Sequence, residues 1–232
     1  VLTWTPKLGE NHWFKLMGGW NIENMDYTST LSKNTGVIDP EHPSLSLTDG
    51  ELPTAKGNGS TSSSLVGAFF RVNYGYKGKY LVEVSGRYDG TSRFKRGHRW
   101  GFFPSFSLGW RISEEPFFEG IREKFNNFKI RYLYGQLGNQ NVGYYDYIRK
   151  ISIGNQNYLF GGDKPTTATI SAPVASNLSW ETSIHNNLGV DMSFLNNRLA
   201  FSADFYIRDT KDMLTSGVAL PSVYGADSPK MN

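Results

Sequence analysis

Residues 65–112 read LVGAFFRVNYGYKGKYLVEVSGRYDGTSRFKRGHRWGFFPSFSLGWRI, three successive runs in which apolar and polar side chains alternate. A period of two is typical of β-strands, because successive side chains point to opposite faces of a sheet. The short Lys77-Gly78 joint between the first two runs is typical of a hairpin turn. The second joint, residues 90–101, is longer and basic. The stretch therefore predicts three strands joined first by a tight turn and then by a loop.

The apolar face of each run ends in aromatic residues. In the second run this face begins at Tyr80, continues through Val82 and Val84, and ends at Tyr88. Transmembrane β-barrel strands show this pattern, with lipid-facing residues between aromatic girdles and polar residues toward the lumen. The expected periplasmic girdle comprises Tyr74, Tyr76, Tyr80, Trp110 and Phe194, and the expected outer girdle comprises Tyr88, Phe102, Tyr134 and Trp180. A soluble β-sandwich with aromatic-rich strands is the alternative.

The rest of the chain repeats the alternation and sorts its connections by length. Further strands are predicted near residues 1–5, 12–25, 128–135, 180–194 and 199–208. Long loops are predicted at about residues 27–64, 90–101 and 138–179, and they alternate with short turns. Residues 113–127 form a connection of intermediate length, with a short helix that Ser113 is expected to cap. Within the last loop, a weak hairpin signal covers residues 144–153. In an up-and-down sheet the long loops all lie at one end, as in outer-membrane barrels, whereas Greek-key sandwiches do not sort their loops in this way.

Composition excludes several classes of protein. No window approaches the roughly 18 consecutive apolar residues of a spanning helix, and the mean hydropathy of −0.44 is compatible with alternating barrel strands. The chain has no cysteine and a net charge of only +3, which argues against thiolate metal sites and nucleic-acid binding. The one dense basic cluster, residues 93–99, is interpreted as a solvated loop. No catalytic motif is present, so we predict no enzyme, cofactor or metal site.

Several long motifs together resemble one family. They are YGYKGKYLVEVSGRYDGTSRF (74–94), RWGFFPSFSLGWRISEEPFF (99–118), FKIRYLYGQLGNQ (128–140), LSWETSIHNNLGVDMSFLNNRLAFSADFYIRDTKDML (178–214) and LPSVYGADS (220–228). In this order they resemble SusC/RagA-type TonB-dependent outer-membrane transporters of Bacteroidetes. The resemblance covers most of residues 13–225.

The resemblance implies a plugged barrel of about 22 strands. This chain offers about eight, with no plug domain and no TonB box, so we expect an all-β, antiparallel transmembrane β-barrel segment. Residues 1–232 are treated as one partial barrel domain. An open eight-stranded sheet leaves unsatisfied edges in lipid. We therefore expect either a piece of a longer polypeptide or part of a split barrel that another chain completes.

For function, the resemblance implies uptake of large nutrients across the outer membrane. The substrate class is glycans or peptides. The expected partners are the remainder of the barrel and its plug, a SusD-like surface lipoprotein, the TonB complex acting through the plug, and outer-membrane lipid. The alternative from a different class is a soluble carbohydrate-binding or adhesin module.

Two sets of candidate site residues follow. The lumen-facing set faces either the substrate or the plug, with structural solvation as the simpler interpretation: Lys15, Arg71, Glu83, Arg87, Arg131, Glu181, His185, Asp191, Asp204 and Arg208, together with Glu23 and Arg111. The second set consists of loop aromatics that either stack on a substrate or partner or pack the loop against its neighbours: Tyr144, Tyr145, Tyr147, Tyr158 and Phe160.

Overall fold

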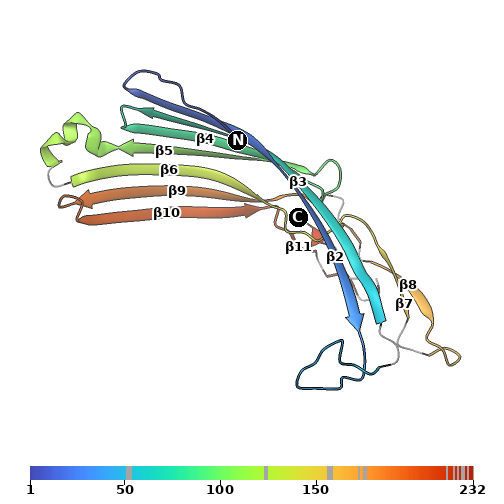
Figure 1. The fold of residues 1–232 in the computed structure, drawn as a ribbon. Coiled ribbons are helices and arrows are strands. Elements are labelled where there is room, and N and C mark those ends of the chain that lie inside the picture. The colour runs from blue at the N-terminus through green and yellow to red at the C-terminus, as the bar shows by residue number, and fades with distance from the viewer. Residues whose placement is uncertain are drawn as a thin grey trace.

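A computed structural model describes residues 1–50, 54–122, 125–155, 159–171, 173–174, 177–217, 219–221, 223, 225, 228 and 230–231. They form one large curved sheet, two short 3-10 helices and two small two-stranded sheets (Figure 1). Among these residues no helix is long and apolar enough to cross a membrane. In chain order the elements are β1 (Leu2–Trp4), β2 (His12–Lys33), β3 (Thr54–Tyr76), β4 (Tyr80–Thr91), β5 (Trp100–Arg111), η1 (Ile112–Glu114), η2 (Pro116–Ile121), β6 (Phe125–Asn139), β7 (Ile151–Asn155), β8 (Thr166–Ile170), β9 (Glu181–Phe194), β10 (Leu199–Lys211), β11 (Thr215–Ser216) and β12 (Lys230–Met231).

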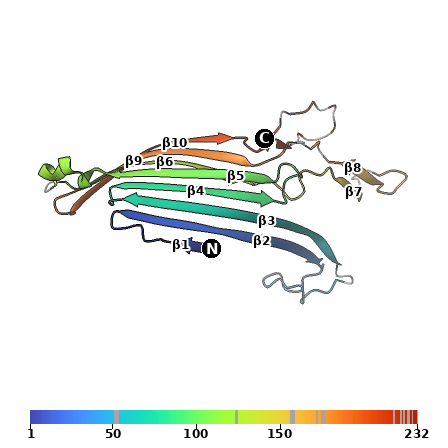
Figure 2. The ribbon, with the colours of Figure 1, turned by 90° about the horizontal axis from the view of Figure 1, so that it is seen from above.

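The large sheet has eight strands in the order β1-β2-β3-β4-β5-β6-β9-β10, and every neighbouring pair is antiparallel. Figure 2 shows this up-and-down order, with β1 at one edge and β10 at the other. The β7–β8 hairpin lies beyond one end of the sheet rather than over its face. The prediction of an antiparallel sheet of about eight strands is confirmed, and the two-sheet sandwich is not observed among the described residues.

The strand registers place most apolar residues of the long strands on one face, although Phe69, Leu81, Phe103 and Leu133 lie on the other. Val84 of β4 lies opposite Val72 of β3 and Phe106 of β5. Farther along the sheet, Leu188 of β9 lies opposite Tyr132 of β6 and Phe205 of β10. Val84, Leu188 and Phe205 are 42%, 48% and 70% exposed, so no described part of the chain covers this face. A soluble protein buries such a continuous apolar surface, whereas a barrel wall presents it to lipid.

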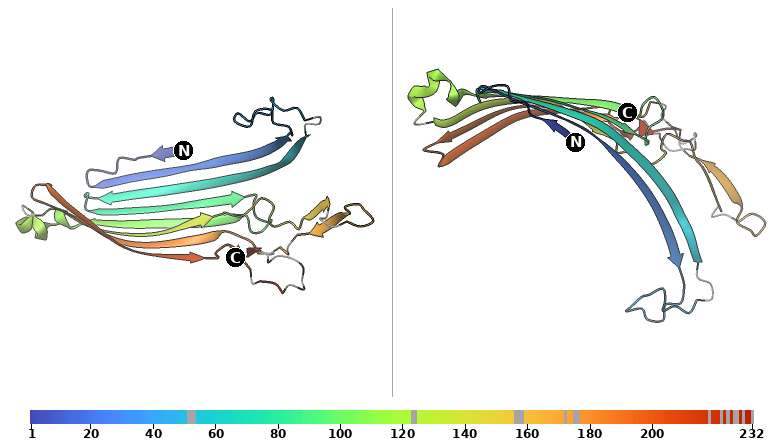
Figure 3. Two further views of the ribbon diagram at one scale, coloured as in Figure 1. Left: turned by 90° about the horizontal axis from the view of Figure 1, so that it is seen from below. Right: turned by 45° about the horizontal axis from the view of Figure 1, so that its top comes forward.

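The connections are sorted between the two ends of the sheet. Figure 3 shows the turns after β3 and β9 and the 3-10 helices at one end, with the β7–β8 hairpin and the far ends of β2 and β3 at the other. In the turn after β3, Lys77 and Gly78 have φ angles of 49° and 65°, and the Lys79 amide donates to the Tyr76 carbonyl over 2.9 Å. This is a type I′ turn, whose twist matches that of antiparallel strands.

The predicted loop 27–64 is wrong in its extent. Strand β2 continues to Lys33 and β3 already begins at Thr54, so the connection covers only residues 34–53, of which 51–53 lie outside the described residues. With 22 residues, β2 is about twice as long as the roughly 9–11 residues needed to cross a bilayer. Its outer half is held by backbone pairing with β3 and is solvated on both faces. The sequence of this outer half therefore lacks the alternation of apolar and polar residues that predicts a strand.

Two smaller predictions also differ from the structure. The hairpin inside the loop 138–179 is formed by β7 and β8, whereas most of residues 144–149 form turns. Ser113 lies within η1 and provides no side-chain cap to either 3-10 helix. The Arg111 backbone precedes η1 directly, so β5 runs into the 3-10 turn without a separate capping residue.

Candidate functional site

The inner face of the sheet carries the polar side chains that alternate with the lipid-facing ones. Its best-defined feature is an ionic cluster across β6, β9 and β10, here called the Arg131 cluster, made of Arg131, Asp191, Asp204 and Ser202. Arg131 Nε lies 3.0 Å from Asp191 Oδ2, and Arg131 Nη2 lies 2.8 Å from Asp204 Oδ2. Ser202 Oγ donates to Asp191 Oδ1 over 2.6 Å. The cluster therefore joins three neighbouring strands on the lumen side.

Gly189 makes room for the Arg131 side chain. It lies between Arg131 and Asp204 in the strand register, and a Cβ at this position would come within 2.6 Å of Arg131 Cζ. The missing side chain lets the guanidinium lie flat against the sheet, within reach of both carboxylates. A glycine inside a strand commonly marks a close approach of this kind.

Two further ion pairs lie on the same face of β3 and β4. Arg71 Nε is 3.4 Å from Glu83 Oε1, and Asn73 Nδ2 donates to Glu83 Oε2 over 2.5 Å. Arg87 makes a bidentate contact with Asp89, with Nε and Nη2 at 3.0 and 2.9 Å from the two carboxylate oxygens. Each pair leaves part of its arginine exposed toward the lumen, with side-chain exposures of 49% and 47%.

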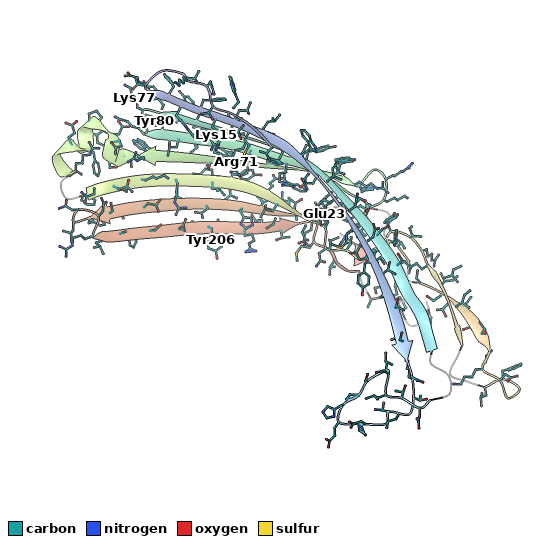
Figure 4. All side chains as sticks on the ribbon, in the orientation of Figure 1. Lys15, Glu23, Arg71, Lys77, Tyr80 and Tyr206 are labelled. Atoms are coloured by element: carbon teal, nitrogen blue, oxygen red, sulfur yellow. The ribbon has the colours of Figure 1, made fainter. Side chains whose placement is uncertain are left out.

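The other predicted inner residues are not gathered into one site. Figure 4 shows Lys15 and Glu23 along β2, Arg71 on β3 and Tyr206 on β10. Within the described part of the chain, the side chains of Lys15 and Arg208 make no hydrogen bond or ion pair. His185 Nε2 shares a 3.1 Å hydrogen bond with Ser183 Oγ. Arg111, at the short-turn end of β5, pairs with Glu114 over 3.0 Å. Among the described residues the inner face is thus a dispersed polar wall with separate ion-pair groups, and the predicted residues do not converge on one site.

A compact apolar group closes the long-loop end of the sheet. This rim cluster consists of Phe94, Phe103, Val142, Leu178 and Trp180. The Trp180 ring packs edge-on against Phe94 and Phe103, with centroid distances of 5.6 and 5.3 Å. Trp180 Nε1 donates to the Arg99 carbonyl over 2.9 Å. The cluster holds residues from three loops against β5.

Trp180 was predicted for the outer girdle, and this is wrong: it is only 8% exposed and belongs to the rim cluster. The alternation that placed it on the lipid face does not extend to residue 180, because β9 begins at Glu181. Without a ladder partner, the side chain is free to turn inward. Its place in the lipid-side aromatic row is taken by Trp100, whose ring stacks on Tyr88 at 4.9 Å.

The loop aromatics divide into packed and exposed residues. The Arg93 guanidinium lies 4.6 Å from the Tyr144 ring centroid, and Tyr144 Oη contacts Met25 Sδ at 3.4 Å. Tyr145 Oη lies 3.1 Å from Ser62 Oγ. Tyr147 is half-buried, whereas Phe160, beside the β7–β8 hairpin, is 80% exposed. Tyr158 lies outside the described residues.

Sequence reasoning missed a carboxylate at the short-turn end. Glu115 Oε1 accepts hydrogen bonds from Tyr80 Oη at 2.7 Å and Trp110 Nε1 at 3.0 Å, and Lys79 Nζ lies 3.3 Å from Oε2. The hydrogen bond from Tyr80, followed by that from Trp110, holds the pKa of the Glu115 carboxyl below its ordinary value of 4.5. The sequence does contain a signal for this contact. Glu115 follows the girdle residue Trp110 by five positions, and the indole N–H of a tryptophan requires a hydrogen-bond acceptor.

We expect Glu115 to stabilise this end of the sheet in a pH-dependent way. Because its pKa is lowered in the folded state, its contribution is fully present above the ordinary value of 4.5 and is lost as the pH falls through the folded-state value. Glu115→Gln should therefore lower the free energy of unfolding near neutral pH, and the difference from the wild type should shrink in acid. Urea titrations of the refolded protein over a pH series measure it.

The matched control is Glu119→Gln, which removes an exposed carboxylate from the neighbouring helix η2. This variant should track the wild type at every pH. A difference between Glu115→Gln and the wild type that stays constant down to strongly acidic pH would contradict the role given to the Glu115 carboxylate.

The sequence was compared with protein families and with known proteins. A family model described as "TonB dependent receptor-like, beta-barrel" matches residues 2–229. The TonB-dependent receptor SusC of Bacteroides thetaiotaomicron is 38% identical over 162 residues, covering 68% of this chain and 16% of that protein. The TonB-dependent receptor P26 of Formosa agariphila is 29% identical over 233 residues, covering all of this chain and 23% of that protein.

The fold also matches solved structures. The structure titled "Structure of the RagAB peptide importer in the 'open-open' state" superposes with a TM-score of 0.77 at 25% identity, covering 99% of this chain and 24% of the matched chain. The structure titled "Structure of the RagAB peptide transporter" gives a TM-score of 0.78 at 24% identity. This chain spans about a quarter or less of the length of the relatives that it matches.

Proposed function

Because the chain belongs to the β-barrel family of TonB-dependent receptors, which are outer-membrane proteins, we propose that it forms part of the wall of an active importer of large nutrients, either glycans or peptides. Its relatives of SusC/RagA type are transporters and not enzymes. The proposal concerns the complete receptor, of which this segment supplies eight wall strands, their turns and their outer loops.

One observation carries the proposal: the strand registers separate a mainly apolar outer face from an inner face that carries the charged residues. Val84, Leu188 and Phe205 mark the outer face, and the Arg131 cluster marks the inner one. A wall of this kind is suited to a wide channel for solutes. Charged side chains keep its lumen hydrated, while lipid covers the outer face.

The inner charges are proposed to contact the plug or the substrate. The Arg131 cluster and the Arg71–Glu83 pair still present free guanidinium hydrogen atoms to the lumen, since each arginine has five N–H donors and uses only some of them. Backbone carbonyl groups of a plug, or hydroxyl and amide groups of a passing substrate, are suitable acceptors. Energy is proposed to arrive through TonB acting on the plug of the complete receptor.

A SusD-like surface lipoprotein is proposed to cover the long-loop end of the barrel. The exposed apolar residues of this end support a partner or substrate contact, in particular Phe160 near the β7–β8 hairpin. Tyr144 and Tyr145 already pack against Arg93, Met25 and Ser62, so they are proposed to support the loops rather than to bind.

Uptake by cells tests the proposed transport. Cells that carry the intact receptor are expected to accumulate labelled oligosaccharides or labelled peptides, and removal of the receptor or of TonB should abolish accumulation. The substrate class is identified by whether the labelled oligosaccharides or the labelled peptides enter the cells. Uptake that is unchanged without the receptor, or that proceeds at the same rate without TonB, would contradict the proposal.

Phe160→Ala is expected to weaken binding at the long-loop end without affecting assembly. Truncation of an exposed aromatic anchor commonly costs about 1–2 kcal/mol, or roughly tenfold in the concentration needed for half-maximal uptake. Phe160→Tyr, which keeps the ring, is the matched control and should behave like the wild type. Equal uptake by the alanine variant and the wild type would remove Phe160 from the binding surface.

The soluble sandwich or adhesin alternative is not supported. Such a module packs two sheets face to face around a dry core. Here the buried apolar residues are confined to the rim cluster and the short-turn end among the described residues, while the mid-strand apolar residues of the outer face are exposed or half-exposed. Partitioning of the protein into detergent rather than buffer is the expected behaviour.

A further inference from the structure

The basic loop, residues 92–99 between β4 and β5, contains the densest positive charge in the chain, and the features described above use only its Arg93, Phe94 and Arg99. Two of its arginines face inward. Arg93 Nη1 donates to the Val142 carbonyl over 3.1 Å, and Arg99 Nε donates to the Phe94 carbonyl over 3.0 Å. Phe94 is fully buried in the rim cluster. These contacts anchor the basic loop to the end of the sheet.

Lys95 and Arg96 behave differently. Both side chains are exposed, and neither forms a hydrogen bond or ion pair with any residue that the structure describes. The backbone between them and the strand is ordered, because the His98 amide donates to the Lys95 carbonyl at 3.0 Å and the Thr91 amide donates to the Arg99 carbonyl at 3.1 Å. The result is a pair of adjacent cations, without a counter-charge, on a short closed loop.

The position of the loop relative to the lipid follows from Trp100. This residue begins β5 and stacks on Tyr88 at an interplanar angle of 11°, and the two rings are 53% and 48% exposed on the lipid-facing side. Tyr and Trp at the end of the lipid-facing row are typical of the membrane–water interface. Arg96 is only four residues from Trp100, so its backbone lies within about 14 Å of the girdle. This distance brings Lys95 and Arg96 within reach of the lipid headgroups.

We propose that Lys95 and Arg96 bind the phosphate groups of outer-leaflet lipid and so form a lipid-headgroup site on the outside of the barrel wall. The chemistry suits phosphate, since a guanidinium binds two oxygens in a fork and a neighbouring ammonium adds a compact charge. Nucleic acid is disfavoured, because its binding in salt needs several neutralised phosphates, whereas only two free cations are present here. The inferred site does not depend on what the receptor transports.

Titration of lipid A, a phosphorylated outer-leaflet lipid, into the detergent-solubilised intact receptor tests the site, with bound lipid counted by native mass spectrometry. The double variant Lys95→Gln/Arg96→Gln is expected to bind lipid A roughly 25-fold more weakly, at about fivefold for each cation near the headgroups. The charge-conserving variant Lys95→Arg/Arg96→Lys should bind nearly as well as the wild type.

The matched control is Lys33→Gln/Lys164→Gln, which removes the same charge from two exposed lysines, one at the outer end of β2 and one in the connection between β7 and β8. It should leave lipid A binding unchanged. Dephosphorylated lipid A should bind the wild type and the Lys95→Gln/Arg96→Gln variant equally weakly.

Three results would overturn the proposal. The first is unchanged lipid A binding by Lys95→Gln/Arg96→Gln. The second is equal loss of binding in the Lys33→Gln/Lys164→Gln control, which would indicate a general charge effect. The third is displacement of lipid A by inorganic phosphate at equimolar concentration, which would assign the site to free phosphate. Circular dichroism of each variant confirms that the barrel is folded before the titrations are compared.

Discussion

Val84→Arg is expected to destabilise the inserted barrel by about 2–4 kcal/mol, because it places a charge on the lipid-facing side near mid-bilayer. Val84 lies halfway along β4 between the aromatic residues Tyr80 and Tyr88, and its partners across the sheet, Val72 and Phe106, are apolar. The measurement is the free energy of unfolding in a lipid refolding titration of the intact receptor.

Ser107→Arg is the matched control for this prediction. Ser107 follows Phe106, the partner of Val84, but its side chain lies on the inner face, opposite Glu83. At the same depth, an arginine there reaches the wet lumen and an acidic neighbour, so a change of less than about 1 kcal/mol is expected. If Val84→Arg proves neutral, or if both variants lose the same stability, Val84 does not face lipid.

Trp180→Ala is expected to open the rim cluster, at a local cost of about 3–5 kcal/mol, as for other large-to-small changes at buried aromatics. The variant removes the ring that packs against Phe94 and Phe103 and the indole N–H that binds the Arg99 carbonyl. Backbone amides of the loops at this end should exchange hydrogen faster, while those of the mid-strand ladder keep their protection.

Trp180→Phe separates the two contributions of this residue. It keeps most of the ring packing and removes the hydrogen bond, so a loss of about 1–2 kcal/mol is expected. Loop exchange rates in Trp180→Ala that match the wild type would show that the rim cluster does not hold the loops. Faster exchange throughout the sheet would instead mean that the cluster stabilises the whole wall.

The sheet was predictable wherever one face meets lipid and the other meets water. Across β3, β4 and β5 the pattern of apolar and polar residues predicts the strands, the hairpin turn and the two faces of the sheet. The pattern is decisive because a register shift of one residue would move every side chain to the opposite face. The outer half of the β2–β3 hairpin was not predictable in this way. Its residues, such as Tyr27 and Thr61, pair through the backbone in water, where no face has to be apolar.

The sites were less predictable than the strands. The alternation assigned Arg131, Asp191 and Asp204 to the inner face, but their meeting depends on the register across three strands and on the space above Gly189. Trp180 was misplaced because the strand periodicity was extended one residue beyond β9. The alternation does not reveal Glu115, because it describes Tyr80 and Trp110 only as lipid-facing rings, whereas their polar O–H and N–H groups make the contacts.

The most direct test of the wall is a cysteine scan along β4, in the intact receptor, with each site carrying a fluorescent label. This chain has no native cysteine of its own, so each introduced thiol is unique within it. Labels at Val82, Val84 and Gly86 are expected to be quenched by lipid-soluble quenchers, and labels at Glu83, Ser85 and Arg87 by water-soluble ones. Quenching without this two-residue alternation, or even-numbered positions that neither quencher reaches, would contradict a barrel wall with lipid on one face and a wet lumen on the other.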